Sequence, residues 1–267
     1  MIKIDLSGVP EDELWSRFEQ EAATEQAALK LEEGRLLRPV LFQMPEGHPN
    51  RLLLIIHHLA VDGVSWRILL GDLNTVSRQL LEARAVALPL KTTSFREWAL
   101  KTIELARDGA LNRELEYWLA KERNQAARLP VDFPGGRNDI SSSRNIRMEL
   151  SQEETEALLQ GLPKLYKATI NDALVASLAR TITEWACNQY VLIDLEGHGR
   201  EDIDPAADLT RTVGWFTALF PVLLEADPSW SAGETLSRIR EQLQLTPNNG
   251  VGYGLLRYGS DNSVTPL

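Results

Sequence analysis

The sequence has few of the residues that build disulfides, metal sites and membrane spans, and each shortage excludes a class of protein. Its 267 residues include one cysteine, Cys187, so an internal disulfide is excluded, and no Cys/His spacing of the zinc type occurs. The two longest apolar stretches, 52–61 and 215–224, are too short to cross a bilayer as helices. The first residues lack the apolar region of a signal peptide. We therefore expect a protein of the reducing cytoplasm, with no membrane span and no metal.

Positive charge is also in short supply. The sequence has 28 Lys and Arg residues against 38 Asp and Glu residues, a net charge of -10. Such a surface repels phosphate backbones and anionic lipid, so nucleic acid is not an expected partner. With 43% hydrophobic and 25% charged residues, the composition is typical of a soluble globular protein. The length allows two modest lobes or one large α/β unit.

The first part of the chain predicts a helix, a hairpin and a second helix. Residues 11–31 place apolar side chains at a roughly helical period. Two apolar runs, 36–44 and 51–58, are separated by a loop that contains Pro and Gly, which is typical of a hairpin. Apolar residues then recur at three- and four-residue intervals, so a helix should begin near Val64 or Ser65.

A polar segment near the middle of the chain is the best linker candidate. Residues 130–143 collect Pro, Gly, Asn, Asp and Ser with almost no apolar content. Residues 144–150 are predicted as a short strand, and Ser151 with Glu154 predicts a capping-box start for the next helix. Further helices are predicted at 95–107, 111–121, 171–185 and 234–245, and further strands at 190–195 and 213–224. The pattern predicts an α/β fold with mixed sheets, in two lobes at 1–135 and 136–267.

The densest chemical signal is the string from His57 to Trp66, HHLAVDGVSW. Adjacent strand residues point to opposite faces, so only one of the two histidines should face a given cavity, and the other should be structural. A histidine at a strand end beside a helix N-terminus suits a general base, although the pair alone favours two satisfied core histidines. For Asp62, capping of the helix or an internal ion pair is favoured over orientation of a site or metal binding.

The HHxxxDG pattern in this string resembles the condensation-domain superfamily, whose fold is two lobes similar to chloramphenicol acetyltransferase that face each other across a tunnel. The whole string is similar to the epimerization branch of that superfamily in nonribosomal peptide synthetases. Three further strings support this branch: DLEGHGRE at 194–201, RTVGWFT at 211–217 and PNNGVGYGLLRY at 247–258. Four motifs in the same order make the resemblance specific.

The resemblance implies a reaction and its residues. It makes His58 the catalytic histidine and Glu196 its partner across the tunnel. The supporting residues that it implies are His57, Asp62, Gly63, Ser65, Trp66 and His198. The expected reaction is L-to-D epimerization of an aminoacyl or peptidyl thioester. The substrate would arrive on the 4'-phosphopantetheine of a peptidyl carrier protein among neighbouring synthetase modules, with no bound cofactor.

Two other functions stay open. A condensation domain, which forms peptide bonds, would use His58 and leave Glu196 without a task. A non-catalytic remnant that only docks a carrier protein is the second alternative. Members of the family begin several dozen residues earlier and continue well past Tyr258, so we expect a fragment with both lobes incomplete and with exposed sheet edges.

Several residues also have simpler interpretations. Glu196 is a candidate surface carboxylate in a Gly-rich loop, and for His198 a supporting hydrogen bond and solvent exposure are equally open. Cys187 is expected in a helix core. The aromatic residues Trp66, Trp215 and Phe216 are expected as walls of the core. No role is expected for His48.

Overall fold

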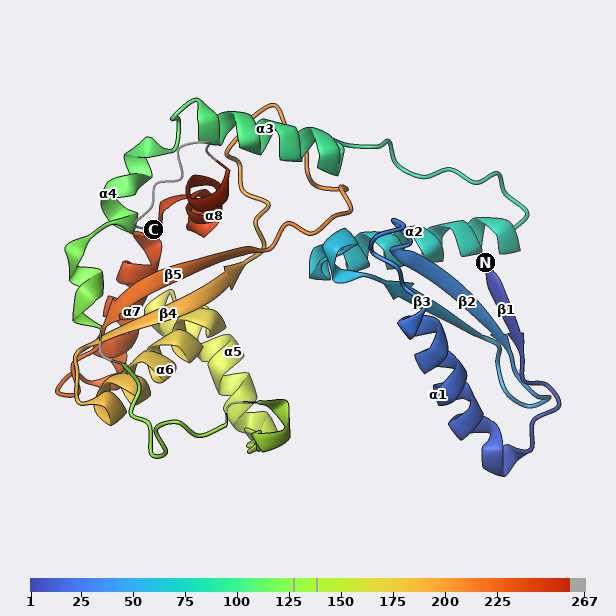
Figure 1. The fold of residues 1–267 in the computed structure, drawn as a ribbon, viewed down its shortest axis with the longest axis horizontal. Coiled ribbons are helices and arrows are strands. Elements are labelled where there is room, and N and C mark those ends of the chain that lie inside the picture. Colours follow the sequence, from blue (N-terminus) through green and yellow to red (C-terminus); the bar gives the residue numbers. More distant parts are fainter. Residues whose placement is uncertain (127, 138, 260–267) are drawn as a thin grey trace. The chain divides into compact units, whose positions relative to one another are not determined.

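The computed structural model describes residues 1–126, 128–137 and 139–259 (Figure 1). The described residues form two compact units, one made of 1–100 and 204–217, and the other of those within 101–203 and 218–259. This division differs from the predicted boundary between 135 and 136. Leu111 and Trp118 are buried in the core of the second unit, which assigns their segment to it. The predicted boundary was placed at a polar loop because of its composition. The boundary between the two units is instead set by which residues are buried together.

The first unit is built on a three-stranded sheet in the order β1-β2-β3. Strand β1 (Ile2–Asp5) is parallel to β2 (Leu37–Gln43), and β2 is antiparallel to β3 (Arg51–Ile56), which confirms the predicted hairpin. Helix α1 (Glu11–Ala27) runs beside this sheet (Figure 1). Its buried side covers a small apolar core formed by Leu6, Leu14, Val40, Phe42, Met44 and Ile55.

Two more helices follow along the chain; the first lies in the first unit, and the second crosses from the first unit into the second after Leu100. Helix α2 (Gly63–Leu81) begins one residue earlier than predicted, directly after its N-cap Asp62. Helix α3 (Phe95–Arg107) has its predicted bounds. Strand β3 stops before the histidine pair, and a short 3₁₀ turn, His58–Ala60, begins at the second histidine.

The second unit surrounds a pair of antiparallel strands, β4 (Tyr190–Gly197) and β5 (Ala218–Glu225). Three helices pack on these strands, α6 (Ile170–Ala186), α7 (Ala232–Gln244) and α8 (Val251–Tyr258) (Figure 1). Their contact surface is the larger apolar core, in which Ala179, Val222, Leu224 and Ile239 are fully buried. Helix α5 (Gln152–Tyr166) starts with the predicted capping box of Ser151 and Glu154.

Several local predictions are wrong. Residues 144–150 form no strand, because a strand needs a neighbouring strand to pair with. Ile146 and Met148 in this segment are each 91% exposed. The helix predicted at 111–121 is a short α4 (Leu115–Trp118) between two 3₁₀ turns, Asn112–Glu114 and Lys121–Gln125. Strand β5 begins five residues later than predicted, since 213–217 follow an irregular path in the first unit.

Cys187 is exposed at the C-cap of α6 in a left-handed conformation, and not in the helix core. The cap terminates the helix, so its side chain leaves the apolar face. Within the described ranges, no helix is both long enough and apolar enough to cross a membrane.

The Pro247–Gly250 turn gives a stability prediction. Gly250 has a φ of +83°, and a Cβ there would lie 1.9 Å from Cδ1 of Phe220. We expect Gly250→Ala to lower the free energy of unfolding by about 2–4 kcal/mol, because left-handed strain and overpacking add. Gly254→Ala is the matched control: it lies in α8, where a Cβ meets nothing within 4 Å, and should be neutral or slightly stabilising. Urea unfolding of both variants checks this, and equal stability of the two would contradict it.

Candidate functional site

The histidine pair lies after β3 and not within it. His57 follows the last strand residue and caps the 3₁₀ turn, and its Nδ1 accepts a hydrogen bond from the Leu59 N–H at 3.1 Å. The predicted argument from alternating strand faces is therefore wrong for these residues. One histidine of the pair was predicted to be structural. The His57 ring has such a contact, because its hydrogen bond caps the turn in which His58 lies.

His58 has an exposed side chain, and its ring contacts an aromatic neighbour. The ring of His58 meets the Trp215 ring edge to face, with centroids 5.7 Å apart and an interplanar angle of 67°. Among residues 1–126, 128–137 and 139–259, no group is hydrogen-bonded to its ring. Each of the other histidines is engaged: His57 with Leu59, His48 with Glu11 at 2.9 Å, and His198 with Glu201 at 3.3 Å. His58 is therefore the histidine whose ring nitrogens have no hydrogen-bond partner among the described residues.

Asp62 fixes the start of α2 and binds a second segment. It is 5% exposed, and its Oδ1 accepts the Ser65 N–H at 2.6 Å, which confirms the predicted capping role. Its Oδ2 accepts the N–H of Phe216 at 3.3 Å. The Trp66 N–H donates to the Asp62 carbonyl at 3.1 Å. One buried carboxylate thus joins the helix start to the RTVGWFT string.

Ser65 makes the second link to the same string. Its fully buried hydroxyl donates to the Gly214 carbonyl at 2.9 Å and accepts the Gly214 N–H at 3.0 Å. Gly214 lies against the Phe95 ring, where a Cβ would be 2.2 Å from Cδ2. The Phe216 ring is buried edge to face on Phe95, with centroids 5.1 Å apart. We call the contacts of Asp62 and Ser65 with 214–216 the clasp.

The segment before the clasp is also tied down. The hydroxyl of Thr212 donates to the Thr93 carbonyl at 2.6 Å, and Asp208 and Thr93 exchange two further hydrogen bonds. Arg211 forms an ion pair with Asp72 of α2 at 2.7 Å. Hydrogen bonds from the Thr210 hydroxyl and N–H lower the pKa of Asp208 below its usual value. Residues 208–216 are therefore an ordered part of the first unit without being helix or strand.

The other predicted members of the string have varied surroundings. Gly63 is exposed as the first residue of α2, and Trp66 is half-buried. Phe216 lies in the core as predicted, at 7% exposed. The prediction that Trp215 forms a wall of the core is wrong, because its side chain is 41% exposed. Its neighbours on both sides are held by the clasp, and it points away from the core.

In the second unit, Glu196 lies in β4 and not in a Gly-rich loop. It pairs with Leu219 of β5, and its side chain is exposed. Its carboxylate has no hydrogen bond or ion pair within the part of the chain that the structure describes. A pocket of about 660 Å³ contains it. Fourteen residues line the pocket: Thr169, Asn171, Asp172, Asp194, Leu195, Glu196, Gly197, His198, Glu201, Phe220, Leu243, Gln244, Thr246 and Asn249.

His198 lines the same pocket but supports Glu201 rather than Glu196. Its Nε2 lies 3.3 Å from Oε1 of Glu201, and its Nδ1 accepts the Arg200 N–H at 3.0 Å. Glu201 also accepts a hydrogen bond from the Asn249 amide at 2.8 Å. Sequence reasoning left a supporting hydrogen bond and solvent exposure open for His198, and its ring is both exposed and hydrogen-bonded. Of the two glutamates in the EGHGRE string, only Glu196 keeps a free carboxylate among the described residues.

Sequence reasoning missed a buried carboxylate that holds the fourth motif. Glu114 is 2% exposed, and it accepts hydrogen bonds from the Asn248 amide at 2.6 Å and the Trp118 indole at 3.0 Å. This contact anchors the turn that carries Asn249 to the pocket. The turn itself had a sequence signal in the paired asparagines before Gly250, because both adopt the left-handed conformation that asparagine tolerates. Nothing in the local sequence marks Glu114.

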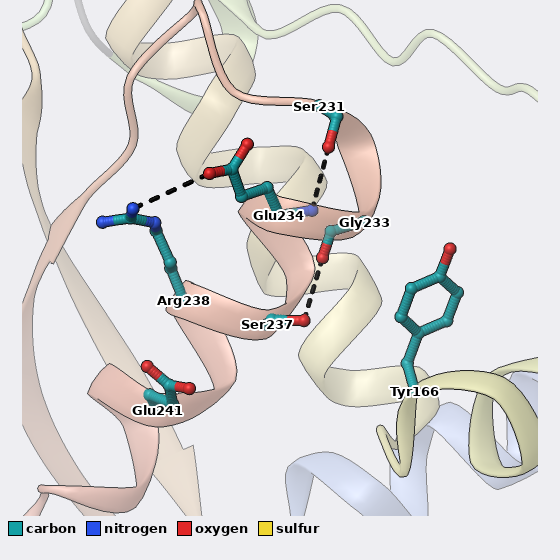
Figure 2. A pocket seen from close by; sticks show the side chains of 7 residues that line it. All are labelled: Tyr166, Ser231, Gly233, Glu234, Ser237, Arg238 and Glu241. Atoms are coloured by element: carbon teal, nitrogen blue, oxygen red, sulfur yellow. Dashed lines mark hydrogen bonds and ion pairs between the residues drawn. The ribbon is translucent and has the colours of Figure 1, made fainter.

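A second pocket, of about 760 Å³, lies between α7 and the end of α5 (Figure 2). Figure 2 shows that four of its lining side chains are engaged at α7: Ser231 caps the helix at Glu234, Ser237 donates to Gly233, and Arg238 pairs with Glu234. We assign it no chemistry. In the described ranges, no three His, Cys, Asp or Glu side chains are grouped to hold a metal ion.

Comparisons with known proteins give a consistent picture. The model of the family described as the condensation domain matches residues 1–266. One of the proteins that make up the linear gramicidin synthase of Brevibacillus parabrevis is 45% identical over 255 residues, which cover 96% of this chain and 3% of that protein. The chain therefore spans a small part of this curated relative.

Solved structures resemble both branches of the superfamily. The epimerization domain from the third module of tyrocidine synthetase B matches with a TM-score of 0.87 and 34% identity, over 99% of this chain and 60% of that one. The first condensation domain of the CDA synthetase matches with a TM-score of 0.69 and 23% identity, over 98% of this chain and 57% of that one. The second likeness shows the shared fold alone. The predicted α/β fold is confirmed.

The clasp predicts a local effect on stability. In Ser65→Ala, the buried N–H and carbonyl of Gly214 lose their partner, so we expect the free energy of unfolding to fall by about 1–3 kcal/mol. Hydrogen exchange of the Gly214 amide should become faster. Ser237→Ala is the control, since that exposed hydroxyl bonds only its own helix, and it should change stability by less than about 0.5 kcal/mol. Unchanged Gly214 exchange in Ser65→Ala would mean that the clasp does not hold the string.

Proposed function

The chain belongs to the condensation domain family, and from this premise we propose that it inverts the α-carbon of an aminoacyl or peptidyl thioester during nonribosomal peptide synthesis. The substrate is carried on the phosphopantetheine arm of a carrier protein, and neighbouring synthetase modules supply and receive it. The similarity to a solved epimerization domain at 34% identity supports this branch.

The reaction needs two acid–base groups. Inversion removes the α-proton from one face of the carbon and returns a proton to the opposite face, with no net gain or loss of protons or electrons. We assign the two roles to His58 and Glu196. In each direction one group starts deprotonated and the other protonated, and the pair is reset by the reverse reaction or by exchange with water.

One observation carries this assignment. In the described ranges, His58 is the histidine whose ring makes no hydrogen bond, and Glu196 is the glutamate of its string whose carboxylate is unbonded. A general base needs a lone pair that is not already committed to a structural bond. Four other polar side chains of the two motifs are committed: Asp62 and Ser65 to the clasp, and His198 and Glu201 to each other. A condensation reaction would leave Glu196 without a role.

The intermediate is an enolate, whose oxygen needs hydrogen-bond donors. The start of α2 offers backbone N–H groups, but those of Ser65 and Trp66 already donate to Asp62. We therefore assign the role to the N–H groups of Gly63 and Val64, the first two of the helix, where the dipole also favours negative charge.

The histidine assignment is tested by α-proton exchange. With an aminoacyl thioester loaded on carrier protein in deuterated water, His58→Ala in a protein that contains residues 1–267 should lower the exchange rate by roughly 100-fold or more, because a general base is lost. His57→Ala should chiefly lower stability, since it removes the bond to Leu59. His48→Ala, outside the four motifs and bonded to Glu11, is the control. Loss of exchange in His57→Ala together with activity in His58→Ala would reverse the assignment.

The glutamate assignment has a stereochemical test. Glu196→Gln keeps the shape of the side chain but removes the titrating group, so exchange from one enantiomer should suffer at least roughly tenfold more than from the other. Glu184→Gln, an exposed change in α6, should alter neither rate. Equal and mild losses from both enantiomers, combined with peptide-bond formation between two loaded carriers, would support the condensation alternative. Carrier binding without any exchange in the unmodified protein would support a docking role alone.

A further inference from the structure

We propose that Trp215 is a positioning residue that holds the His58 imidazole in one orientation. This inference rests on the proposed function for the role of His58 as a base. The positioning itself is a property of the first unit. Both residues belong to that unit, although they lie far apart in the sequence and in two different motifs.

The His58 ring has little else to fix it. Its ring is exposed and, in the part of the chain that the structure describes, has no hydrogen bond, so the edge-to-face contact with Trp215 is the interaction that orients it. Edge-to-face pairs favour one arrangement by roughly 2- to 13-fold in population. Productive proton transfer requires a defined ring orientation, so a preference of this size acts directly on the rate.

Trp215 itself is held from both sides. Gly214 before it is bonded through both its N–H and its carbonyl to the Ser65 hydroxyl, and the N–H of Phe216 after it is bonded to Asp62. The Phe216 ring is buried on Phe95. The backbone at Trp215 is therefore fixed although it lies outside helices and strands.

The exposure of Trp215 excludes a simple core role. The side chain is 41% exposed, whereas its neighbour Phe216 is 7% exposed. A large aromatic side chain that is turned outward from a rigid backbone contributes little to the core. The contact with the His58 ring therefore accounts for the position of the Trp215 side chain.

The pair Trp15 and His48 provides a matched control within the same unit. These rings also meet edge to face, with centroids 6.1 Å apart, and Trp15 is 42% exposed. Here, however, the histidine is also hydrogen-bonded to Glu11. The same substitution at residue 15 should therefore leave its histidine in place and leave the reaction unchanged.

The first test measures the ring directly by NMR on the 267-residue chain. Three-bond couplings of labelled histidines should show one dominant χ1 rotamer for His58, averaged rotamers in Trp215→Leu, and a restored rotamer in Trp215→Phe. In Trp15→Leu, His48 should keep its rotamer. A His58 rotamer that is unchanged in Trp215→Leu, in a chain with unaltered thermal unfolding, would overturn the inference whether or not the protein is an epimerase.

The second test uses α-proton exchange of a carrier-bound aminoacyl thioester. Trp215→Leu should lower kcat roughly tenfold with little change in KM, because the base remains present but is oriented for less of the time. Trp215→Phe should recover most of the rate, and Trp15→Leu should match the unmodified protein. If KM rises instead and kcat is kept, Trp215 contacts substrate and does not position His58. If His58→Ala is active while the NMR result holds, the proposed function fails and the positioning stands.

Discussion

The carboxylate of Asp62 is the interaction on which the rest of the first unit's motif depends. It is buried, and burial of a carboxylate costs several kcal/mol unless hydrogen bonds and charge offset it. Here the positive end of α2 and the N–H groups of Ser65 and Phe216 supply that compensation. The same carboxylate therefore starts the helix and retains the segment around Trp215. Removal of either partner would leave a buried charge with fewer hydrogen bonds, so the two features form together.

This arrangement separates hydrogen-bonded side chains from an unbonded one within one short string. His57, Asp62 and Ser65 each use their polar atoms on a structural bond, and the two with committed oxygens are buried. His58 alone among the string's polar side chains is exposed with an uncommitted ring in the described structure. A similar division occurs in the second unit, where His198 and Glu201 bond each other and Glu196 remains free in its pocket. We regard this pattern as the physical content of the motifs.

Local chemistry predicted the elements that depend on local contacts. The capping box at Ser151 and the capping role of Asp62 follow from bonds that span three residues, and both are present. The sequence did not predict what depends on distant partners. The Ser65–Gly214 bond joins residues 149 positions apart, and no local pattern specifies it. The same reason explains the missing strand at 144–150, whose apolar residues are suited to a strand but lack a neighbour in the described ranges.

The histidine pair shows where one geometric step from the sequence was wrong. Strand alternation assigned the two rings to opposite faces, but the strand ends at Ile56 and a 3₁₀ turn begins. The rings differ because the turn itself needs a cap, which uses a nitrogen of His57. The resemblance to a family supplied the choice of His58, and the geometry supplies a physical reason for it.

Along the chain, the four motifs alternate between the two units. The motifs at 57–66 and 211–217 belong to the first unit, and those at 194–201 and 247–258 belong to the second. Each unit thus combines one motif that carries a candidate base with one that is bonded to it, through the clasp in the first and through Asn249 and Glu201 in the second.

This division explains the long connection between β4 and β5. Neighbouring antiparallel strands can be joined by as few as two residues, yet here residues 204–217 of the connection fold with the first unit. That excursion brings Trp215 to His58, and four residues later the chain has returned to Leu219, the cross-strand partner of Glu196. One ring contact, four residues of chain and one strand pair therefore connect the two candidate bases. This path has a non-covalent contact at each end and covalent chain between them, so it exists whatever the arrangement of the two units.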